Sequence, residues 1–243
     1  MRCVRILSIL AILSFCINPV AKAEVGFTVA AGAGYKRLVE QLCTTFTART
    51  GTPVQQIFGN MGQVTAQAQE SGAIDFIIRD KSYLDATSLS FSEEHTIGRG
   101  KLIAAVAKGV TIKGLDDLTN ATVTRIAIAD SKKAIYGHAA MEFLTIKGIW
   151  EQIQPKILIV GTVPQVTAYV VSGEVDIGFI NLTEALAIGD KVGLLIPVDE
   201  KLYTPILIVA KRLQQSRNAD VAASFVSFLQ SKEAEVIIKK QGL

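Results

Sequence analysis

The chain is poor in the side chains that build metal centres and catalytic sites. Its 243 residues include three cysteines, two histidines and one tryptophan. The histidines, His95 and His138, lie far apart and form no cluster with metal-ligand spacing. The sequence also lacks the Gly-x-Ser-x-Gly, His-Glu-x-x-His and phosphate-loop motifs of hydrolases, zinc peptidases and nucleotide-binding enzymes. We therefore expect no catalysis and neither a metal nor a cofactor.

Residues 1–23 have the pattern of a secretory signal peptide. Arg2 and Arg5 supply the positive start, residues 6–17 the apolar stretch, and Ala21-Lys22-Ala23 a small-x-small cleavage site. The apolar stretch is too short to span a bilayer. The sequence thus predicts export across the inner membrane, with cleavage after Ala23.

Cysteine is almost absent from the predicted mature chain. Cys3 and Cys16 leave with the signal peptide, so Cys43 stands alone and no intrachain disulfide can form. Lipidation of Cys16 is the alternative to free release, but Phe15 before it is bulkier than the small residue that such processing requires. We expect stability to come from an apolar core.

The predicted mature chain also lacks an excess of charge of either sign. The full chain has 25 Lys and Arg against 22 Asp and Glu, and the signal peptide takes three of the basic residues with it. No basic run is interleaved with aromatic residues. The balanced charge argues against a nucleic-acid or membrane-surface partner.

Two glycine turns are the most informative local feature. Residues 30–35 read Ala-Ala-Gly-Ala-Gly-Tyr, and residues 58–62 read Phe-Gly-Asn-Met-Gly. Each turn follows a strand-like run and opens a helix-like run, so backbone N–H groups and the positive end of a helix dipole face it. Two such turns predict an anion-binding cleft.

Apolar runs that alternate with helical stripes predict an α/β fold. The expected strands are residues 26–31, 54–58, 74–78, 101–107, 125–128, 156–160 and 205–210. The expected helices are residues 35–49, 63–71, 136–147 and 163–172, with one or two more in the tail at 218–240.

One string occurs twice, where a predicted helix ends and a strand begins. Residues 71–75 read Ser-Gly-Ala-Ile-Asp and residues 172–176 read Ser-Gly-Glu-Val-Asp. Such a junction is common in α/β proteins, so coincidence is the alternative to true repetition. We favour two similar lobes, with residues 101–107 and 205–210 as the strands that cross between them.

The chain resembles a known family, the periplasmic substrate-binding proteins of the molybdate-binding type, which serve ABC importers. The resemblance extends over most of the mature chain and rests on the order of several short strings. These are Val29-Ala30-Ala31, Arg49-Thr50-Gly51, residues 58–62 and 71–75, Arg125 to Asp130, Gly148-Ile149-Trp150 before Pro155-Lys156, and residues 172–179.

The resemblance implies an α/β, two-lobe periplasmic binding protein of type II. Each lobe would be a mostly parallel sheet flanked by helices, and two hinge strands would join the lobes. Lobe 1 would comprise residues 24–101 and 206–243, and lobe 2 residues 102–205. A periplasmic monomer with an inner-membrane ABC permease as its partner is implied as well.

The ligand positions depart from the pattern of that family. It places the hydroxyl groups of two serines and one tyrosine where this sequence has Gly34, Met61 and Asn181. Backbone N–H groups at the turns that hold Tyr136 and Val163 would remain. Each missing charged hydrogen bond costs roughly 1.5–3 kcal/mol, so losing three would weaken molybdate binding by several decades.

Other side chains on or beside the same turns are candidates to replace the lost hydroxyls, namely Tyr35, Asn60, Tyr136 and Asn181. Arg79 is a further candidate, because it ends a predicted parallel strand, where ligands of such sheets gather. The planar guanidinium of Arg79 would favour a carboxylate or a phosphate. The alternative for Arg79 is a surface ion pair with Asp80 or Asp85.

The remaining candidates have structural alternatives too. Gly34 could serve the turn alone, Met61 could fill a gap in the core, Asn60 and Asn181 could be ordinary turn residues, and Tyr136 could cover a helix end.

We predict from these observations an extracytoplasmic solute-binding protein that closes its lobes on a small anion and delivers it to an ABC permease. The anion would be a molybdate-like oxyanion or another small anionic solute. Two alternatives stay open: a sensory or accessory binding protein of the same fold, and a ligand that is an organic phosphate or carboxylate.

Overall fold

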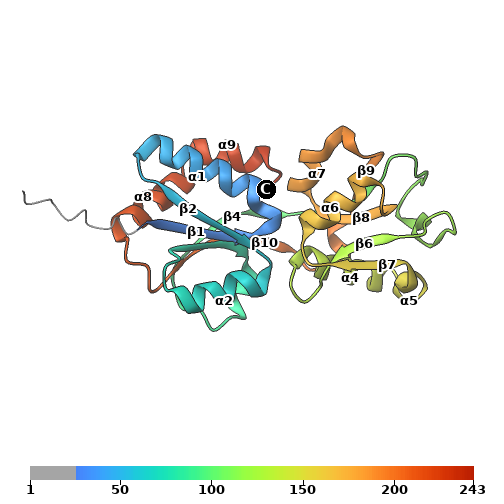
Figure 1. Ribbon diagram of the computed structural model, residues 1–243, viewed down its shortest axis with the longest axis horizontal. Coiled ribbons are helices and arrows are strands. Elements are labelled where there is room, and N and C mark those ends of the chain that lie inside the picture. Colours follow the sequence, from blue (N-terminus) through green and yellow to red (C-terminus); the bar gives the residue numbers. More distant parts are fainter. Residues whose placement is uncertain (1–25) are drawn as a thin grey trace, which may run out of the picture.

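The computed structural model describes residues 26–243, which form two α/β lobes side by side (Figure 1). The predicted signal peptide, with Cys3 and Cys16, lies outside the described residues. Within the described part, no helix has both the length and the apolar character needed to cross a membrane.

The first lobe is built on a five-stranded sheet with the order β2-β1-β3-β10-β4. β1 pairs in parallel with β2 and β3, whereas β10 runs antiparallel to β3 and β4. The strands are β1 (Phe27–Gly32), β2 (Val54–Gly59), β3 (Phe76–Asp80), β4 (Phe91–Gly100) and β10 (Ile206–Leu213).

The second lobe repeats this arrangement with the order β7-β6-β8-β5-β9. β6 pairs in parallel with β7 and β8, and β5 runs antiparallel to β8 and β9. The strands are β5 (Leu102–Val106), β6 (Ile126–Ala129), β7 (Ile157–Val160), β8 (Ile177–Asn181) and β9 (Leu194–Pro197).

Helices cover both sheets (Figure 1). Those of the first lobe are α1 (Lys36–Thr50), α2 (Met61–Ser71), α3 (Lys81–Asp85), α8 (Ala219–Leu229) and α9 (Lys232–Lys240). Those of the second lobe are α4 (Ile135–Ile146), α5 (Trp150–Ile153), α6 (Val163–Ser172) and α7 (Leu182–Ile188). Short 3-10 turns are η1 (Ala33–Tyr35), η2 (Leu115–Thr119), η3 (Gln154–Lys156), η4 (Gly189–Lys191) and η5 (Glu200–Leu202).

The repeated Ser-Gly-x-Ile/Val-Asp string has the same place in both lobes. Gly72 and Gly173 end α2 and α6 in the left-handed region, with φ of 58° and 77°. Asp75 then accepts a hydrogen bond from the backbone of Thr28 at 2.9 Å, and Asp176 accepts one from Arg125 at 2.9 Å. Each carboxylate therefore ties its junction to the start of the neighbouring central strand, which confirms the predicted repetition.

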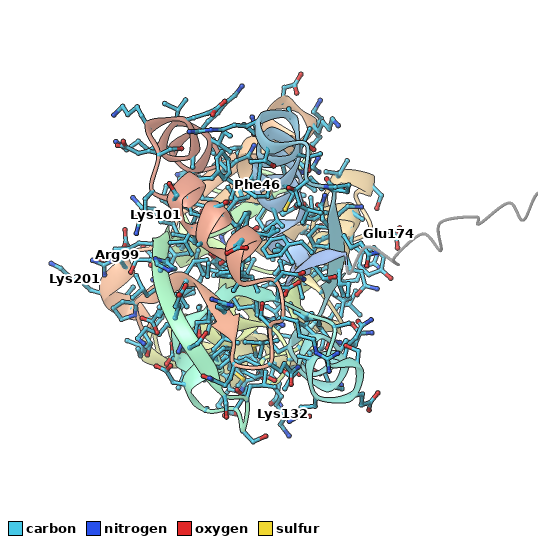
Figure 2. The ribbon with its side chains drawn as sticks, turned by 90° about the vertical axis from the view of Figure 1, so that its left-hand side faces the viewer. Phe46, Arg99, Lys101, Lys132, Glu174 and Lys201 are labelled. Carbon is cyan, nitrogen blue, oxygen red and sulfur yellow. The ribbon has the colours of Figure 1, made fainter. Side chains whose placement is uncertain are left out.

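Aromatic rings fill the interior of the first lobe. Phe225 of α8 lies 5.4 Å from the ring centroid of Phe27, 5.2 Å from that of Phe46 and 5.3 Å from that of Phe76. Figure 2 shows Phe46 inside this lobe and Lys201 at the periphery. The tail thus returns to the first lobe, as predicted, and it forms two helices rather than one.

The chain crosses between the lobes near the two predicted hinge strands. β4 ends at Gly100 in the first sheet, and β5 begins at Leu102 in the second; the return crossing enters β10 at Ile206, which pairs with Gly100. The two-lobe type II architecture is therefore as predicted, but each sheet is mixed rather than mostly parallel, with two parallel and two antiparallel strand pairs. The division of the chain at residues 101/102 and 205/206 stays a prediction.

The charged residues Glu93, Glu94 and His95 lie in β4, an edge strand that is not among the strands predicted from the apolar runs. Glu94 pairs in register with Lys211 of β10, and Glu93 pairs with Arg212. Opposite charges across the strands replace the apolar alternation from which a strand is normally predicted.

Candidate functional site

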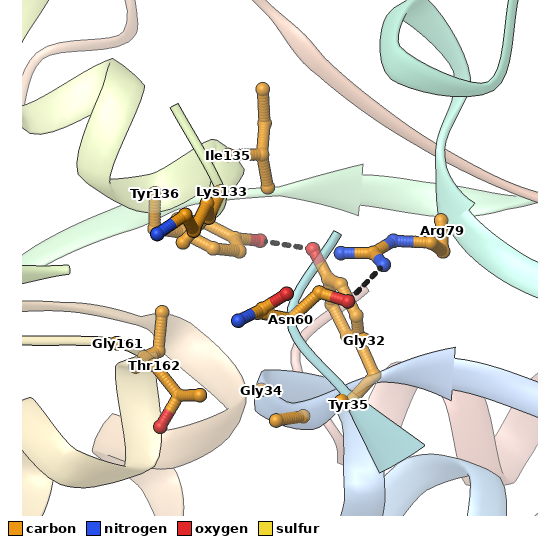
Figure 3. Close-up of a pocket in the computed structure, with 14 residues that line it drawn as sticks. Gly32, Gly34, Tyr35, Asn60, Arg79, Lys133, Ile135, Tyr136, Gly161 and Thr162 are labelled. Atoms are coloured by element: carbon orange, nitrogen blue, oxygen red, sulfur yellow. Dashed lines mark hydrogen bonds between the residues drawn. The ribbon is translucent and has the colours of Figure 1, made fainter. Parts of the chain in front are cut away.

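A cavity of about 30 Å³ lies between the lobes. Its lining comes from both of them, as Figure 3 shows. The residues that line it are Gly32, Ala33, Gly34, Tyr35, Gly59, Asn60, Arg79, Lys133, Ala134, Ile135, Tyr136, Gly161, Thr162 and Val163.

The starts of four helical segments meet at this cavity. Two belong to the first lobe, η1 leading into α1 and the start of α2, and two to the second lobe, the starts of α4 and α6. The first N–H groups of a helix have no partner within it, and the helix dipole makes that end positive. Four such ends around one cavity give it a positive potential and free N–H groups, which suit an anion.

Two of the helix starts carry matching capping boxes. Asn60 accepts a hydrogen bond from Gln63 N at 3.0 Å and donates its own N–H to Gln63 Oε1 at 3.0 Å. Thr162 and Gln165 repeat this exchange at α6. Because the Asn60 side-chain oxygen is committed to the cap, its amide nitrogen is the end that extends into the cavity (Figure 3).

Glycine lets the start of α4 approach the end of β6 very closely. A Cβ at Gly137 would overlap the carbonyl group of Ala129, so only glycine fits there. This contact fixes the first turn of α4 and with it Tyr136. Gly100 has a similar role, because a Cβ there would overlap the Tyr136 hydroxyl.

The hydroxyls of Tyr35 and Tyr136 meet across the cavity at 2.6 Å. Both side chains are buried, with exposed fractions of 3% and 2%. Burial raises the pKa of both phenols well above the ordinary range, so both keep their protons at neutral pH. One proton is used in the mutual hydrogen bond, and the other is left to donate elsewhere.

Arg79, at the end of β3, brings a buried positive charge to the cavity. Its Nη1 donates to the Asn60 carbonyl oxygen at 3.1 Å, and its guanidinium lies 5.4 Å from the ring centroid of Tyr83. Its other terminal nitrogen points toward the tyrosine hydroxyls (Figure 3). The side chain does not form the ion pair considered for it: Asp85 pairs instead with Lys81 and Lys211.

The lobes are also joined by direct hydrogen bonds between their residues. Asn181 Nδ2 donates to the Gly34 carbonyl at 2.8 Å, and Met61 N donates to the Lys133 carbonyl at 2.9 Å. Thr183 Oγ1 adds a bond of 2.8 Å to the Gln241 carbonyl. The two lobes are therefore closed on each other.

Six of the eight predicted ligand residues meet at this cavity. Gly34, Tyr35, Asn60, Arg79, Tyr136 and Val163 line it. The other two, Met61 and Asn181, lie behind it: Met61 is 5% exposed and Asn181 fully buried, and both join the lobes. Whether any of the eight binds ligand stays a proposal.

Sequence reasoning overlooked two polar residues of the lining, Thr162 and Lys133. Thr162 had a usable signal, because Thr followed three residues later by Gln is a capping box before a helix. Lys133 had none. Its ammonium lies 3.2 Å from Asp130, and its side chain is 57% exposed at the edge of the cavity.

The lining contains cationic residues and no carboxylate. Within residues 26–243, no group of three or more His, Cys, Asp or Glu is placed to hold a metal ion. The chemistry available at the cavity is hydrogen-bond donation together with positive charge, which suits an oxyanion.

Comparison with known proteins agrees with this geometry. Residues 27–243 match the family described as "Bacterial extracellular solute-binding protein". The chain is 27% identical over 229 residues to the "Molybdate-binding protein ModA" of Rhodobacter capsulatus, covering 92% of this chain and 89% of that protein. It is 22% identical over 228 residues to the "Putative ABC transporter substrate-binding lipoprotein YvgL" of Bacillus subtilis, covering 91% and 87%.

The fold has similar solved structures. The periplasmic molybdate-binding protein of Azotobacter vinelandii superposes with a TM-score of 0.81 at 24% identity, covering 89% of this chain and 97% of that one.

Proposed function

Because the chain belongs to the bacterial extracellular solute-binding proteins, of the molybdate-binding type that its sequence resembles, we propose that it captures a small anion between its lobes. The bound anion is then delivered to the permease of an ABC transporter. A solute-binding role follows from membership of the family. That the solute is an anion, and that it is delivered to a permease, is what we propose.

One observation carries the proposal: four helix starts and a buried arginine converge on a cavity whose lining contains no carboxylate. Such a lining attracts negative charge and repels cations. The cavity volume of about 30 Å³ corresponds to roughly two or three water positions. We infer a ligand of few heavy atoms, such as a molybdate-like oxyanion or another small anionic solute.

The proposed contacts divide between side chains and backbone. Tyr35, Asn60 and Arg79 donate from their side chains, and Tyr136 adds the hydroxyl that closes the cavity. Backbone N–H groups at Gly34, Tyr136 and Val163 complete the set, since a helix start leaves them free for a ligand.

Met61 and Asn181 contribute to ligand binding indirectly, without touching the ligand. Their hydrogen bonds to Lys133 and Gly34 join the lobes, so they favour the closed state in which the ligand is held. A ligand that touches both lobes stabilises that state, because it binds the closed arrangement better than an open one. The permease then has a closed, loaded shape to recognise.

The proposal includes a location and a partner. The signal-peptide pattern of residues 1–23 supports cleavage after Ala23 and a periplasmic mature protein, expected as a monomer. The partner is an inner-membrane permease, in keeping with the similarity to the Bacillus subtilis protein named "Putative ABC transporter substrate-binding lipoprotein YvgL".

A thermal-shift screen of the mature protein tests the proposal. The panel contains molybdate, tungstate, sulfate, phosphate, phosphonates and small carboxylates. An anion at about 1,000 times its Kd stabilises the native state by about 4 kcal/mol, which raises the Tm by about 10 °C for a chain of this size. Titration calorimetry on the best anion then gives its Kd. A flat response to every anion refutes the proposed function.

A further inference from the structure

Arg79 is a deeply buried cation without a countercharge in contact. Its exposed fraction is 5%, and no carboxylate oxygen of residues 26–243 lies within 4.0 Å of its guanidinium nitrogens. Burial lowers its pKa to about 10, although Tyr83, Tyr35 and Asp80 act in the opposite direction. A charge removed from water in this way destabilises the protein until something neutralises it.

Lys211 provides the contrast, because it is the other buried cation among residues 26–243, with 6% exposed. Its ammonium pairs with the carboxylate of Asp85 and lies 3.0 Å from that of Glu94. The protein therefore balances a buried cation where the cation only supports the fold. It leaves Arg79 unbalanced at the cavity.

No carboxylate of residues 26–243 forms an ion pair with Arg79, although Asp80 acts on its charge from beyond ion-pair distance. Asp80 follows it in the chain, but its Oδ1 accepts hydrogen bonds from Ser82 Oγ at 2.6 Å and from Tyr83 N at 2.9 Å, as the cap of α3. Lys133 is itself cationic and is paired with Asp130. The buried charge of the cavity thus comes from Arg79.

The guanidinium is also held in position. Its Nη1 bond to the Asn60 carbonyl and the Tyr83 ring fix its plane, and a Cβ at Gly32 would lie 3.4 Å from Nη2. With one of five donors committed, the free donors on the Nη2 side face the cavity beside the Tyr35 hydroxyl (Figure 3). The guanidinium is planar, and its free N–H donors can bind two oxygens of one anionic group at the same time.

We propose that Arg79 is the specificity-determining residue of the site, and that it selects an anion presenting two oxygens of a carboxylate or phosphate-type group. The inference rests on the proposed function and deepens it. The ligand supplies the countercharge that the fold withholds from Arg79, so binding relieves a destabilising charge. We expect a small carboxylate or phosphate to bind better than molybdate, because the shorter C–O and P–O bonds place two oxygens closer to the spacing of the guanidinium donors than the longer Mo–O bonds do.

The test compares three variants with the wild type, ligand-free and with orthophosphate, acetate or molybdate. Arg79→Met removes the charge but keeps an unbranched side chain that adapts to the space. Arg79→Lys keeps the charge without the planar fork. Arg99→Met is the matched control, because Arg99 is exposed on β4 and its loss changes the net charge equally.

We expect Arg79→Met to weaken binding of phosphate or acetate at least 100-fold and to unfold, ligand-free, at the wild-type midpoint or a few degrees above it. Arg79→Lys binds at an intermediate level, and Arg99→Met binds like the wild type. A merely structural arginine would show the opposite, a lower ligand-free midpoint.

Any of three results overturns the proposal. The first is an Arg79→Met variant whose Kd for phosphate or acetate is within threefold of wild type, and the second is a ligand-free unfolding midpoint lowered by several degrees in that variant. The third is a wild-type protein that binds molybdate more tightly than both phosphate and acetate. A wild type that responds to none of the wider anion panel refutes the proposed function instead, and this is established before any variant is compared.

Discussion

Asn181 joins the two lobes with one side chain, and replacing it tests whether lobe closure and anion binding are coupled. Its Oδ1 accepts a hydrogen bond from Glu184 N at 3.2 Å and so caps α7, while its Nδ2 donates to the Gly34 carbonyl at 2.8 Å. The first bond lies within the second lobe, and the second bond joins the lobes. Asn181→Ser keeps a good helix cap and removes the donor that reaches Gly34.

The size of the effect follows from the bond that is lost. Asn181 is fully buried, so a missing hydrogen bond to Gly34 costs the closed state about 1–2 kcal/mol. An anion bound only by the closed state then binds about 5–30 times more weakly. The ligand-free stability of each lobe should stay close to wild type, because the cap is retained.

Titration calorimetry with the best anion of the screen measures the loss, and urea unfolding of ligand-free protein checks the fold. Asn181→Ala is the companion variant: it loses the cap as well, so its unfolding free energy should fall by about 1 kcal/mol more than that of Asn181→Ser. Wild-type affinity in a normally folded Asn181→Ser would refute the reasoning, since closure would then not depend on this bond.

Three further outcomes follow from packing. Gly100→Val drives a side chain into the space of the Tyr136 hydroxyl, and we expect calorimetry to show at least tenfold weaker anion binding in a folded protein; unchanged affinity would contradict the contact. Phe225→Ala removes a ring that packs against four other phenylalanines, so urea unfolding should show a loss of about 3–5 kcal/mol, and a loss below about 1 kcal/mol would contradict this packing. Burial raises the pKa of Cys43 to about 12, so its thiol should react with Ellman's reagent at pH 8 only after unfolding; rapid reaction of the native protein would contradict its burial.

Local patterns were sufficient where a residue's role depends on its neighbours in the chain. The helix expected at residues 163–172 agrees with α6 at both ends, because Pro164 follows the cap and Gly173 adopts the left-handed conformation that ends it. The helix expected at residues 63–71 begins two residues earlier, at Met61. Its cap, Asn60, and its first residue, Met61, lie within the glycine turn, where the pattern predicts a loop.

Local patterns failed where a residue's partner is distant in the chain. β4 is stabilised by Lys211 and Arg212 opposite its glutamates, and those residues are more than 100 positions away. The lining of the cavity also depends on residues that are distant in the chain. Six of eight candidate residues share one cavity, yet only the folded chain shows that Met61 and Asn181 lie behind the lining and that Thr162 and Lys133 belong to it.

The sequence by itself determined the two α/β lobes and the helix starts that meet at the cavity, since periodicity, caps and glycines act over a few residues. Only the tertiary structure decided the balance of charge at the site. Arg79 could have met Asp80 or Asp85, but Asp80 caps α3 and Asp85 binds Lys211, so the arginine stays buried and unpaired at the cavity. Burial and ion pairing depend on which distant groups the fold brings together.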